Sequence, residues 1–281
     1  MIKIIADTLS CIPPAEAHDL GIAYVPQIIQ FGADESYRDD SEIDSATFLK
    51  KLRLASSLPQ TAAPPPALYT HIYEQYAAEG HTMLVICPSA QVSGTFRSAE
   101  VAAQDFPQAD IRIIDTKSIA SSLGQMVRLA NEWASQGVDA DSIVARVNEM
   151  ATRDRIMFIV DTLEYLQKGG RIGKARAFVG SLLQVKPILA FHDGQTEPVE
   201  QQRTKRRAIA RLCELVLETC PRSPESYISI LQGDALDDAE FLAEYFKKCL
   251  GITNIPIFFL PPAILVHSGP GAVGVSYFVA R

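Results

Sequence analysis

Short apolar runs alternate with amphipathic stretches along this chain. A short apolar run bounded by turn residues is typical of a buried strand, whereas apolar residues at i, i+3, i+4 and i+7 are typical of a helix. Helical spacing is found at Leu123, Met126, Val127, Ala130 and Trp133, and again at Ala239, Ala243, Phe246 and Leu250. The strand candidates are residues 2–6, 82–87, 110–115, 156–160, 185–191, 227–231, 256–260 and 263–267. The alternation of the two patterns predicts an α/β fold.

The two halves of the chain differ in regularity. In residues 1–155 each strand candidate is nearly all apolar and precedes a helical stretch, which predicts a mostly parallel sheet flanked by helices. Residues 156–281 contain a hairpin signal at Asp193-Gly194, then two helix–strand units, then adjacent strands with no helix between Leu260 and Val273. This order predicts a mixed or antiparallel sheet with helices. We therefore expect two domains, divided near residue 155 after a helix pair at about 120–151.

Composition and charge exclude several classes of protein. The 281 residues contain 26 Lys and Arg against 33 Asp and Glu, a net charge of −7, which repels a nucleic-acid backbone. Hydrophobic residues are 47% and charged residues 21% of the chain, and no 18-residue stretch is free of charged or turn residues, so neither disorder nor a membrane span is predicted. The apolar run at the first residues is too short for a signal peptide, so we expect a cytoplasmic protein.

Several familiar binding motifs are incomplete or misplaced in this chain. The five cysteines are odd in number and contain no C-x-x-C pair, so neither a disulfide framework nor a zinc site is predicted. The G-x-G-x-x-G match that starts at Gly269 lies too close to the end of the chain for a dinucleotide-binding unit. The glycine-rich stretch that starts at Gly169 has Ala175 where a P-loop needs Ser or Thr. No metal and no cofactor is predicted.

Three short stretches keep a possible chemical role. Val92-Ser93-Gly94-Thr95 follows an apolar strand and precedes a helical stretch, so it either caps the helix or binds an anion at its N-terminus. The glycines around Arg171 precede a helix expected at 174–183, and they form either a tight turn with a solvated cation or a clamp for a carboxylate or phosphate. His267, at the end of the strand candidate at 263–267, is either a buried core residue or a functional one. Thr61 is either a cap or a ligand.

A basic cluster surrounds the start of one predicted helix. It consists of Arg203, Lys205, Arg206, Arg207 and Arg211. Such a cluster is ordinarily a solvated face, and the alternative is a docking site for a protein or an anionic membrane surface.

Four stretches of the chain occur in an order that resembles the DegV family over essentially its whole length. They are Asp7-Thr8, VSGT at residues 92–95, DTLEYLQKGGRIG at 161–173 and HSGPG at 267–271. The resemblance implies a two-domain α/β protein that binds a long-chain fatty acid between its domains. It also implies that the protein is not itself an enzyme, and that a separate ATP-dependent fatty acid kinase subunit phosphorylates the bound carboxylate.

The resemblance also assigns residues. Ser93 and Thr61 would hydrogen-bond the carboxylate beside Gly94 and Thr95, and Arg171 and His267 would complete the polar end of the site. Separately from the resemblance, the basic cluster makes Arg203, Lys205, Arg206 and Arg207 the candidates for binding a protein partner such as the kinase. The chain departs from the family pattern at three alanines, which reduce the side-chain donors near the head group: Ala62, Ala63 and Ala90.

Two other functions remain open on the residues alone. The first is a lipid hydrolase or acyltransferase with Ser93 as nucleophile and His267 as base. The second is a lipid sensor whose basic cluster docks a protein or makes transient contact with an anionic membrane surface.

Overall fold

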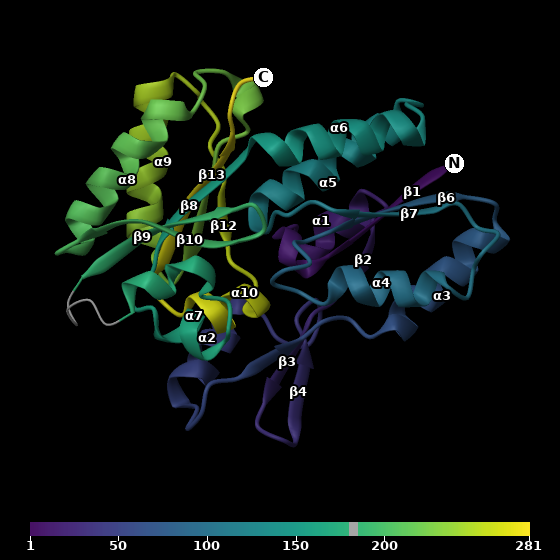
Figure 1. Ribbon diagram of the computed structural model, residues 1–281, viewed down its shortest axis with the longest axis horizontal. Helices are drawn as coiled ribbons and strands as arrows, with labels where there is room; N and C mark the ends of the chain where they lie inside the picture. The colour runs from purple at the N-terminus through teal and green to yellow at the C-terminus, as the bar shows by residue number, and fades with distance from the viewer. Residues whose placement is uncertain (180–184) are drawn as a thin grey trace. The chain divides into compact units, whose positions relative to one another are not determined.

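The computed structural model describes residues 1–179 and 185–281, which divide into two compact units (Figure 1). The first unit comprises Met1–Asp44 and Pro59–Thr152, and the second comprises Ser45–Leu58 and Arg153–Arg281. Each unit has its own central sheet with helices packed against it, so the predicted α/β class is confirmed. The second unit also receives helix α2 (Ser45–Leu54) from within the span of the first.

The central sheet of the first unit is parallel throughout. Its strands, in spatial order, are β2 (Ala23–Val25), β1 (Ile2–Asp7), β6 (Thr82–Cys87) and β7 (Ile111–Asp115). Parallel pairing places the carboxyl ends of all four strands at one edge of the sheet. Asp7 and Cys87 therefore end neighbouring strands at that edge.

Helices cover both faces of this sheet. Met83 and Val85 pack in one buried cluster with residues of α3 (Pro66–Ala78) and α4 (Thr95–Ala103). Leu84 alternates with them and is equally buried, so the opposite face is covered as well. There α5 (Ala120–Ser135) contacts β1 and β6, and it is followed by α6 (Ala140–Arg153), which confirms the predicted helix pair. The short α1 (Pro14–Asp19) contacts β2.

A second, antiparallel sheet in the first unit was not predicted. It consists of β4 (Glu35–Arg38), β3 (Ile28–Phe31) and β5 (Gln60–Ala62), in that spatial order. Each strand has only three or four residues, too few for the alternation of apolar and polar positions to be recognised.

The sheet of the second unit is mixed, as predicted. Its order is β10 (Gln195–Gln202), β9 (Lys186–His192), β8 (Asp154–Ile159), β13 (Ala272–Phe278), β11 (Ser229–Gly233) and β12 (Ile257–Phe259). Only the β11–β12 pair is parallel. The hairpin at Asp193-Gly194 is confirmed, because β9 and β10 pair there and both turn residues have positive φ, as a type I′ turn requires.

Two long helices pack side by side against this sheet (Figure 1). They are α8 (Lys205–Thr219), capped by the Thr204 hydroxyl, and α9 (Leu236–Leu250). Their apolar faces share one buried cluster with the strands, which includes Leu212, Val216, Leu242, Phe246, Ile230 and Val275. A single-turn 3-10 helix, Pro224–Ser226, joins α8 to β11.

The prediction of a strand at 263–267 is wrong, because these residues form α10 (Pro262–Ser268). Pro262 occupies a first-turn position where no backbone N–H is needed, and Gly269 ends the helix with a positive φ. A short, largely buried helix has the same mostly apolar sequence as a buried strand. The expectation of no helix between Leu260 and Val273 is wrong for the same reason.

The helix expected at 174–183 differs from the structure in type and in bounds. The structure has a 3-10 helix at Gly173–Phe178, preceded by α7 (Glu164–Lys168), and residues 180–184 of that prediction lie outside the described residues.

Candidate functional site

The VSGT stretch begins α4 at the carboxyl end of β6. The Ser93 Oγ accepts a hydrogen bond from the Thr95 backbone N–H at 3.3 Å and lies 2.9 Å from the Thr95 Oγ1. The Ser93 backbone N–H donates to the Ser89 carbonyl oxygen at 3.1 Å. Ser93 is only partly buried, while Thr95 is 1% exposed. Ser93 therefore contributes to the helix start and also keeps an accessible hydroxyl.

Asp7 lies behind these hydroxyls, at the end of β1. Its Oδ2 accepts from the Thr95 Oγ1 at 2.8 Å and from the Gln27 Nε2 at 2.6 Å, and its Oδ1 accepts from the Leu9 backbone N–H at 3.1 Å. The Gln27 Nε2 also donates to the Thr95 Oγ1 at 2.9 Å. The ends of parallel strands meet at one edge of a sheet, and this brings residues 7, 27 and 95 together.

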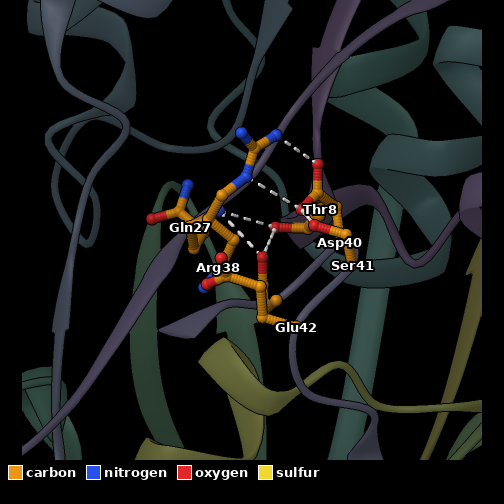
Figure 2. A network of polar contacts seen from close by, with 7 residues as sticks. Thr8, Gln27, Arg38, Asp40, Ser41 and Glu42 are labelled. Atoms are coloured by element: carbon orange, nitrogen blue, oxygen red, sulfur yellow. Dashed lines mark hydrogen bonds and ion pairs between the residues drawn. The ribbon is translucent and has the colours of Figure 1, made fainter. Parts of the chain in front are cut away.

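A second buried carboxyl, Asp39, joins this network through Gln27. The Asp39 Oδ1 accepts from the Thr8 Oγ1 at 2.7 Å and from the Gln27 backbone N–H at 2.8 Å. Figure 2 shows Thr8 and Gln27 beside the loop that carries this carboxyl. In that loop the Arg38 guanidinium binds Asp40 at 2.8 Å, and the Arg38 backbone N–H donates to Glu42 at 2.7 Å (Figure 2).

Burial changes the acidity of both carboxyls. Loss of hydration raises the pKa of Asp7 to about 7, against the hydrogen bonds from Thr95 and Gln27, which lower it. Burial also raises the pKa of Asp39 to about 7, and the nearby charge of Asp7 adds to the rise. Both carboxyls therefore change protonation state near neutral pH.

The structure brings the Thr61 segment alongside the VSGT stretch. Thr61 lies on β5, opposite Ile29 of β3. A Cβ placed on Gly94 would lie 3.2 Å from the Ala63 Cβ, so the two segments touch. Of the other alanines that depart from the family pattern, Ala62 is exposed, and Ala90 is exposed with its backbone N–H donating to Asp115.

In the second unit, the stretches at 161–173 and 267–271 pack against each other. A Cβ on Gly169 would lie 2.2 Å from the His267 Nδ1, and a Cβ on Gly269 would lie 2.3 Å from the Tyr165 ring. Any larger residue at these two positions would separate α7 from α10. These glycines therefore serve close packing between the two motifs.

Arg171 and His267 lie in this packed region. The Arg171 Nη1 donates to the Gly169 carbonyl oxygen at 2.8 Å, and burial lowers the pKa of its guanidinium. Burial and the positive charge of Arg171 lower the pKa of His267 to about 3. At neutral pH Arg171 supplies the positive charge here, and His267 is a neutral imidazole that can donate one hydrogen bond.

The basic cluster divides into structural and exposed residues. The Lys205 Nζ donates to the Gly271 carbonyl oxygen at 2.9 Å and lies 2.9 Å from the Asp238 Oδ2. The Arg211 guanidinium pairs with Glu200 at 2.9 Å. Arg203, Arg206 and Arg207 are exposed.

Other chemistry receives no support from the described residues. Among residues 1–179 and 185–281 there is no group of three or more His, Cys, Asp or Glu side chains placed to hold a metal ion. No helix in the same part of the chain has both the length and the apolar composition to span a membrane. Gly269 and Gly271 lead into strand β13 and not into a helix, unlike a dinucleotide-binding loop.

Gln27 and Asp39 were not predicted from the sequence. Both lie in short connections after brief strands, where no periodic pattern marks them. Only Asp7 carried a signal, as an acidic residue at the end of an apolar strand.

Comparison with known proteins identifies the family of this chain. The family model described as "Uncharacterised protein, DegV family" matches residues 1–280. A DegV domain-containing protein of Halalkalibacterium halodurans is 31% identical over 281 residues, which cover 100% of this chain and 99% of that protein. Among solved structures, a DegV family protein from Thermus thermophilus described by its fatty acid binding has a TM-score of 0.90 at 28% identity, with 99% of both chains covered. DegV from Bacillus subtilis, described as a fatty acid binding protein, has a TM-score of 0.87 at 28% identity, also with 99% of both chains covered.

The fold and these motifs define a class of two-unit α/β proteins with a parallel sheet in one unit and a mixed sheet in the other. Within that class the family match is complete along the chain. The chain belongs to the DegV family, and the resemblance seen in the sequence is confirmed.

Proposed function

We propose that this chain binds a long-chain fatty acid in the cytoplasm and presents its carboxylate to a separate ATP-dependent kinase. The observation that carries the proposal is the clustering of the family motifs within each unit. Ser93 lies beside the Thr61 segment in the first unit, and Arg171 lies beside His267 in the second. Relatives with the same fold are described as fatty-acid-binding proteins, which supports the proposed ligand.

Burial of the acyl chain supplies most of the affinity. At about 0.8 kcal/mol per methylene, roughly 14 methylenes give about 11 kcal/mol before the costs of association. The carboxylate has the opposite preference, because an ionised group removed from water must find hydrogen-bond donors.

The proposed donors suit that carboxylate. Ser93 and Thr61 supply hydroxyls, Gly94 and Thr95 supply the backbone at a helix start, and Arg171 supplies a positive charge. The neutral His267 adds one ring N–H.

Phosphoryl transfer mainly requires that the acceptor oxygen be held in position. We therefore assign the holding of the carboxylate to this chain and the transfer itself to the partner. The nearest side-chain partner of the Ser93 hydroxyl is the Thr95 hydroxyl, which is not a base able to activate it as a nucleophile. This geometry favours a binding role for Ser93 over the hydrolase alternative.

The first test is to purify the chain, extract it with organic solvent and identify the released lipids by mass spectrometry. We expect one fatty acid per chain. Ser93→Ala combined with Arg171→Ala should weaken fatty-acid binding by about tenfold or more, because each loses a hydrogen bond to a charged group. Ser98→Ala, on helix α4 beyond the VSGT stretch, is the control and should bind normally. A chain that carries no lipid and binds no added fatty acid would contradict the proposal.

The exposed arginines at the start of α8 are the proposed contact for the kinase. Arg206→Glu with Arg207→Glu should slow fatty-acid phosphorylation by the kinase and leave fatty-acid binding intact. Lys247→Glu with Lys248→Glu, on α9, changes the net charge equally and serves as the control. Equal slowing by both pairs would show that only net charge matters.

A further inference from the structure

A buried chain of hydrogen bonds connects Ser93 to Asp7. It runs from the Ser93 Oγ to the Thr95 Oγ1 at 2.9 Å, and from the Thr95 Oγ1 to the Asp7 Oδ2 at 2.8 Å. Asp7 and Thr95 are each 1% exposed, and Gln27, which donates to both of them, is 2% exposed. Because these three residues are closed to water, the protons of Asp7, Thr95 and Gln27 are shared within the chain, and only the partly buried Ser93 at its end can also meet solvent.

The number of protons determines the direction of each hydrogen bond. The Thr95 hydroxyl has one proton, and Gln27 already donates to both Thr95 and Asp7. If Asp7 is ionised, Thr95 donates to Asp7, and Ser93 must donate to Thr95 to satisfy their 2.9 Å contact. If Asp7 is protonated, Asp7 donates to Thr95 and Thr95 donates to Ser93.

Only the second arrangement frees the Ser93 proton for a ligand. In the first, a ligand carboxylate that takes this proton leaves two hydroxyl oxygens 2.9 Å apart with no proton between them. An arriving carboxylate also adds negative charge near Asp7, which favours protonation of the buried acid. Binding and protonation therefore support each other.

The groups around Asp7 leave few alternatives for this proton. The neighbouring tyrosines and cysteines are Tyr24, Tyr69, Cys11 and Cys87. Burial raises the pKa of each above its ordinary value, and the charge of Asp7 adds to the rise. These groups therefore stay neutral near pH 7. Arg128 faces Cys11 and is paired with Glu16 at 2.9 Å. Asp39 is the one neighbour among these that also titrates near pH 7, and its bonds go to Thr8 and Gln27, not to Thr95.

We propose that Asp7 is a positioning residue for the bound carboxylate: acting through Thr95 it directs the Ser93 hydroxyl to the ligand, and it takes up one proton from solvent when the carboxylate binds. This inference rests on the proposed function and adds the uptake of one proton to the binding of the carboxylate.

The test is calorimetric titration with dodecanoate below its micelle concentration, at pH 7.5 in two buffers of different ionisation enthalpy. The wild-type chain should take up more than about half a proton per ligand, and its affinity should fall on the order of tenfold from pH 6.5 to 8.5. Asp7→Asn keeps a side-chain donor towards Thr95 and should bind with no proton uptake and no such pH dependence. Asp39→Asn is the matched control and should keep the uptake.

A second pair of variants separates positioning from folding. Thr95→Val keeps the buried shape and breaks the chain, so proton uptake should be lost, and Thr95→Ser should restore it. Dodecanoate binding without proton uptake in the wild-type chain, or uptake that persists in Asp7→Asn, would overturn the positioning role alone. Absence of any fatty-acid binding by the wild-type chain would overturn the proposed function and this role together.

Discussion

The imidazole of His267 determines which residue can stand at position 169. A Cβ at this position would lie 2.2 Å from the His267 Nδ1, well inside van der Waals contact. His267 is itself held in α10, where its neighbours Val266 and Ser268 are buried. A methyl group added at position 169 must therefore displace the ring.

Gly169→Ala should lower the free energy of unfolding by about 1–3 kcal/mol, the usual cost of overpacking a buried contact. Combining it with His267→Ala should recover part of this loss, because the contact with the imidazole is removed while the Tyr165 carbonyl oxygen, 2.9 Å from the added Cβ, remains. Chemical denaturation of the two single variants and the double variant measures this coupling. Additive losses would show that His267 is not the obstacle.

At the residue scale the sequence predicted about half of the candidate site. Ser93, Thr61, Arg171 and His267 stand in recognisable motifs, and the structure places Ser93 and Arg171 in polar clusters. The network behind Ser93 was not predictable, because Gln27 and Asp39 meet Asp7 only through the pairing of strands far apart in the chain.

Helix α8 has an unfavourable distribution of charge at its start. Lys205, Arg206 and Arg207 occupy its first turn, where the helix dipole favours acidic residues. Lys205 is compensated by Asp238, whereas Arg206 and Arg207 are exposed. A helix that tolerates this arrangement is consistent with a docking role for the two arginines.

Replacing Arg206 and Arg207 by Glu should raise the stability of the second unit by about 0.3–1 kcal/mol per substitution at low salt. Thermal unfolding at low and high salt measures the gain, which salt should reduce. Arg207→Gln, which removes charge without reversing it, should give a smaller gain. A loss of stability would mean that the arginines have structural partners.

At the element scale, the hairpin and α10 show when local sequence is sufficient. Asp193-Gly194 specifies its turn by backbone preference alone, so the hairpin was predictable. The apolar run at 263–267 fits a buried strand as well as a buried helix, and its packing partners decide between them. The three-residue β5 gives even less local information.

At the scale of the whole molecule, the buried titratable groups give the two units opposite responses to pH. In the first unit, Asp7 and Asp39 have pKa values of about 7 in the folded state, above their ordinary 3.8. The folded state thus holds extra protons, and stability is lost as the pH rises through 7. In the second unit, the pKa of His267 is about 3, below its ordinary 6.5, so stability is lost as the pH falls through that range.

Between pH 5 and pH 8 the first unit should therefore lose about 2–3 kcal/mol for each carboxyl, and the second unit should gain about 2 kcal/mol. Hydrogen exchange corrected for intrinsic rates can follow β6 for the first unit and β13 for the second. Asp7→Asn with Asp39→Asn should flatten the response of β6, and His267→Gln should flatten that of β13. Responses of the same sign in both units would contradict these protonation states.

The sequence by itself determined the α/β class, most of the strands, the hairpin and the family motifs, because each depends on periodicity or on backbone preferences within a few residues. Tertiary structure alone decided that residues 263–267 are helical, that Gly169 lies against His267, and that Asp7, Gln27 and Thr95 are joined by hydrogen bonds. These features depend on sheet order and close packing between distant segments, and no local pattern records them.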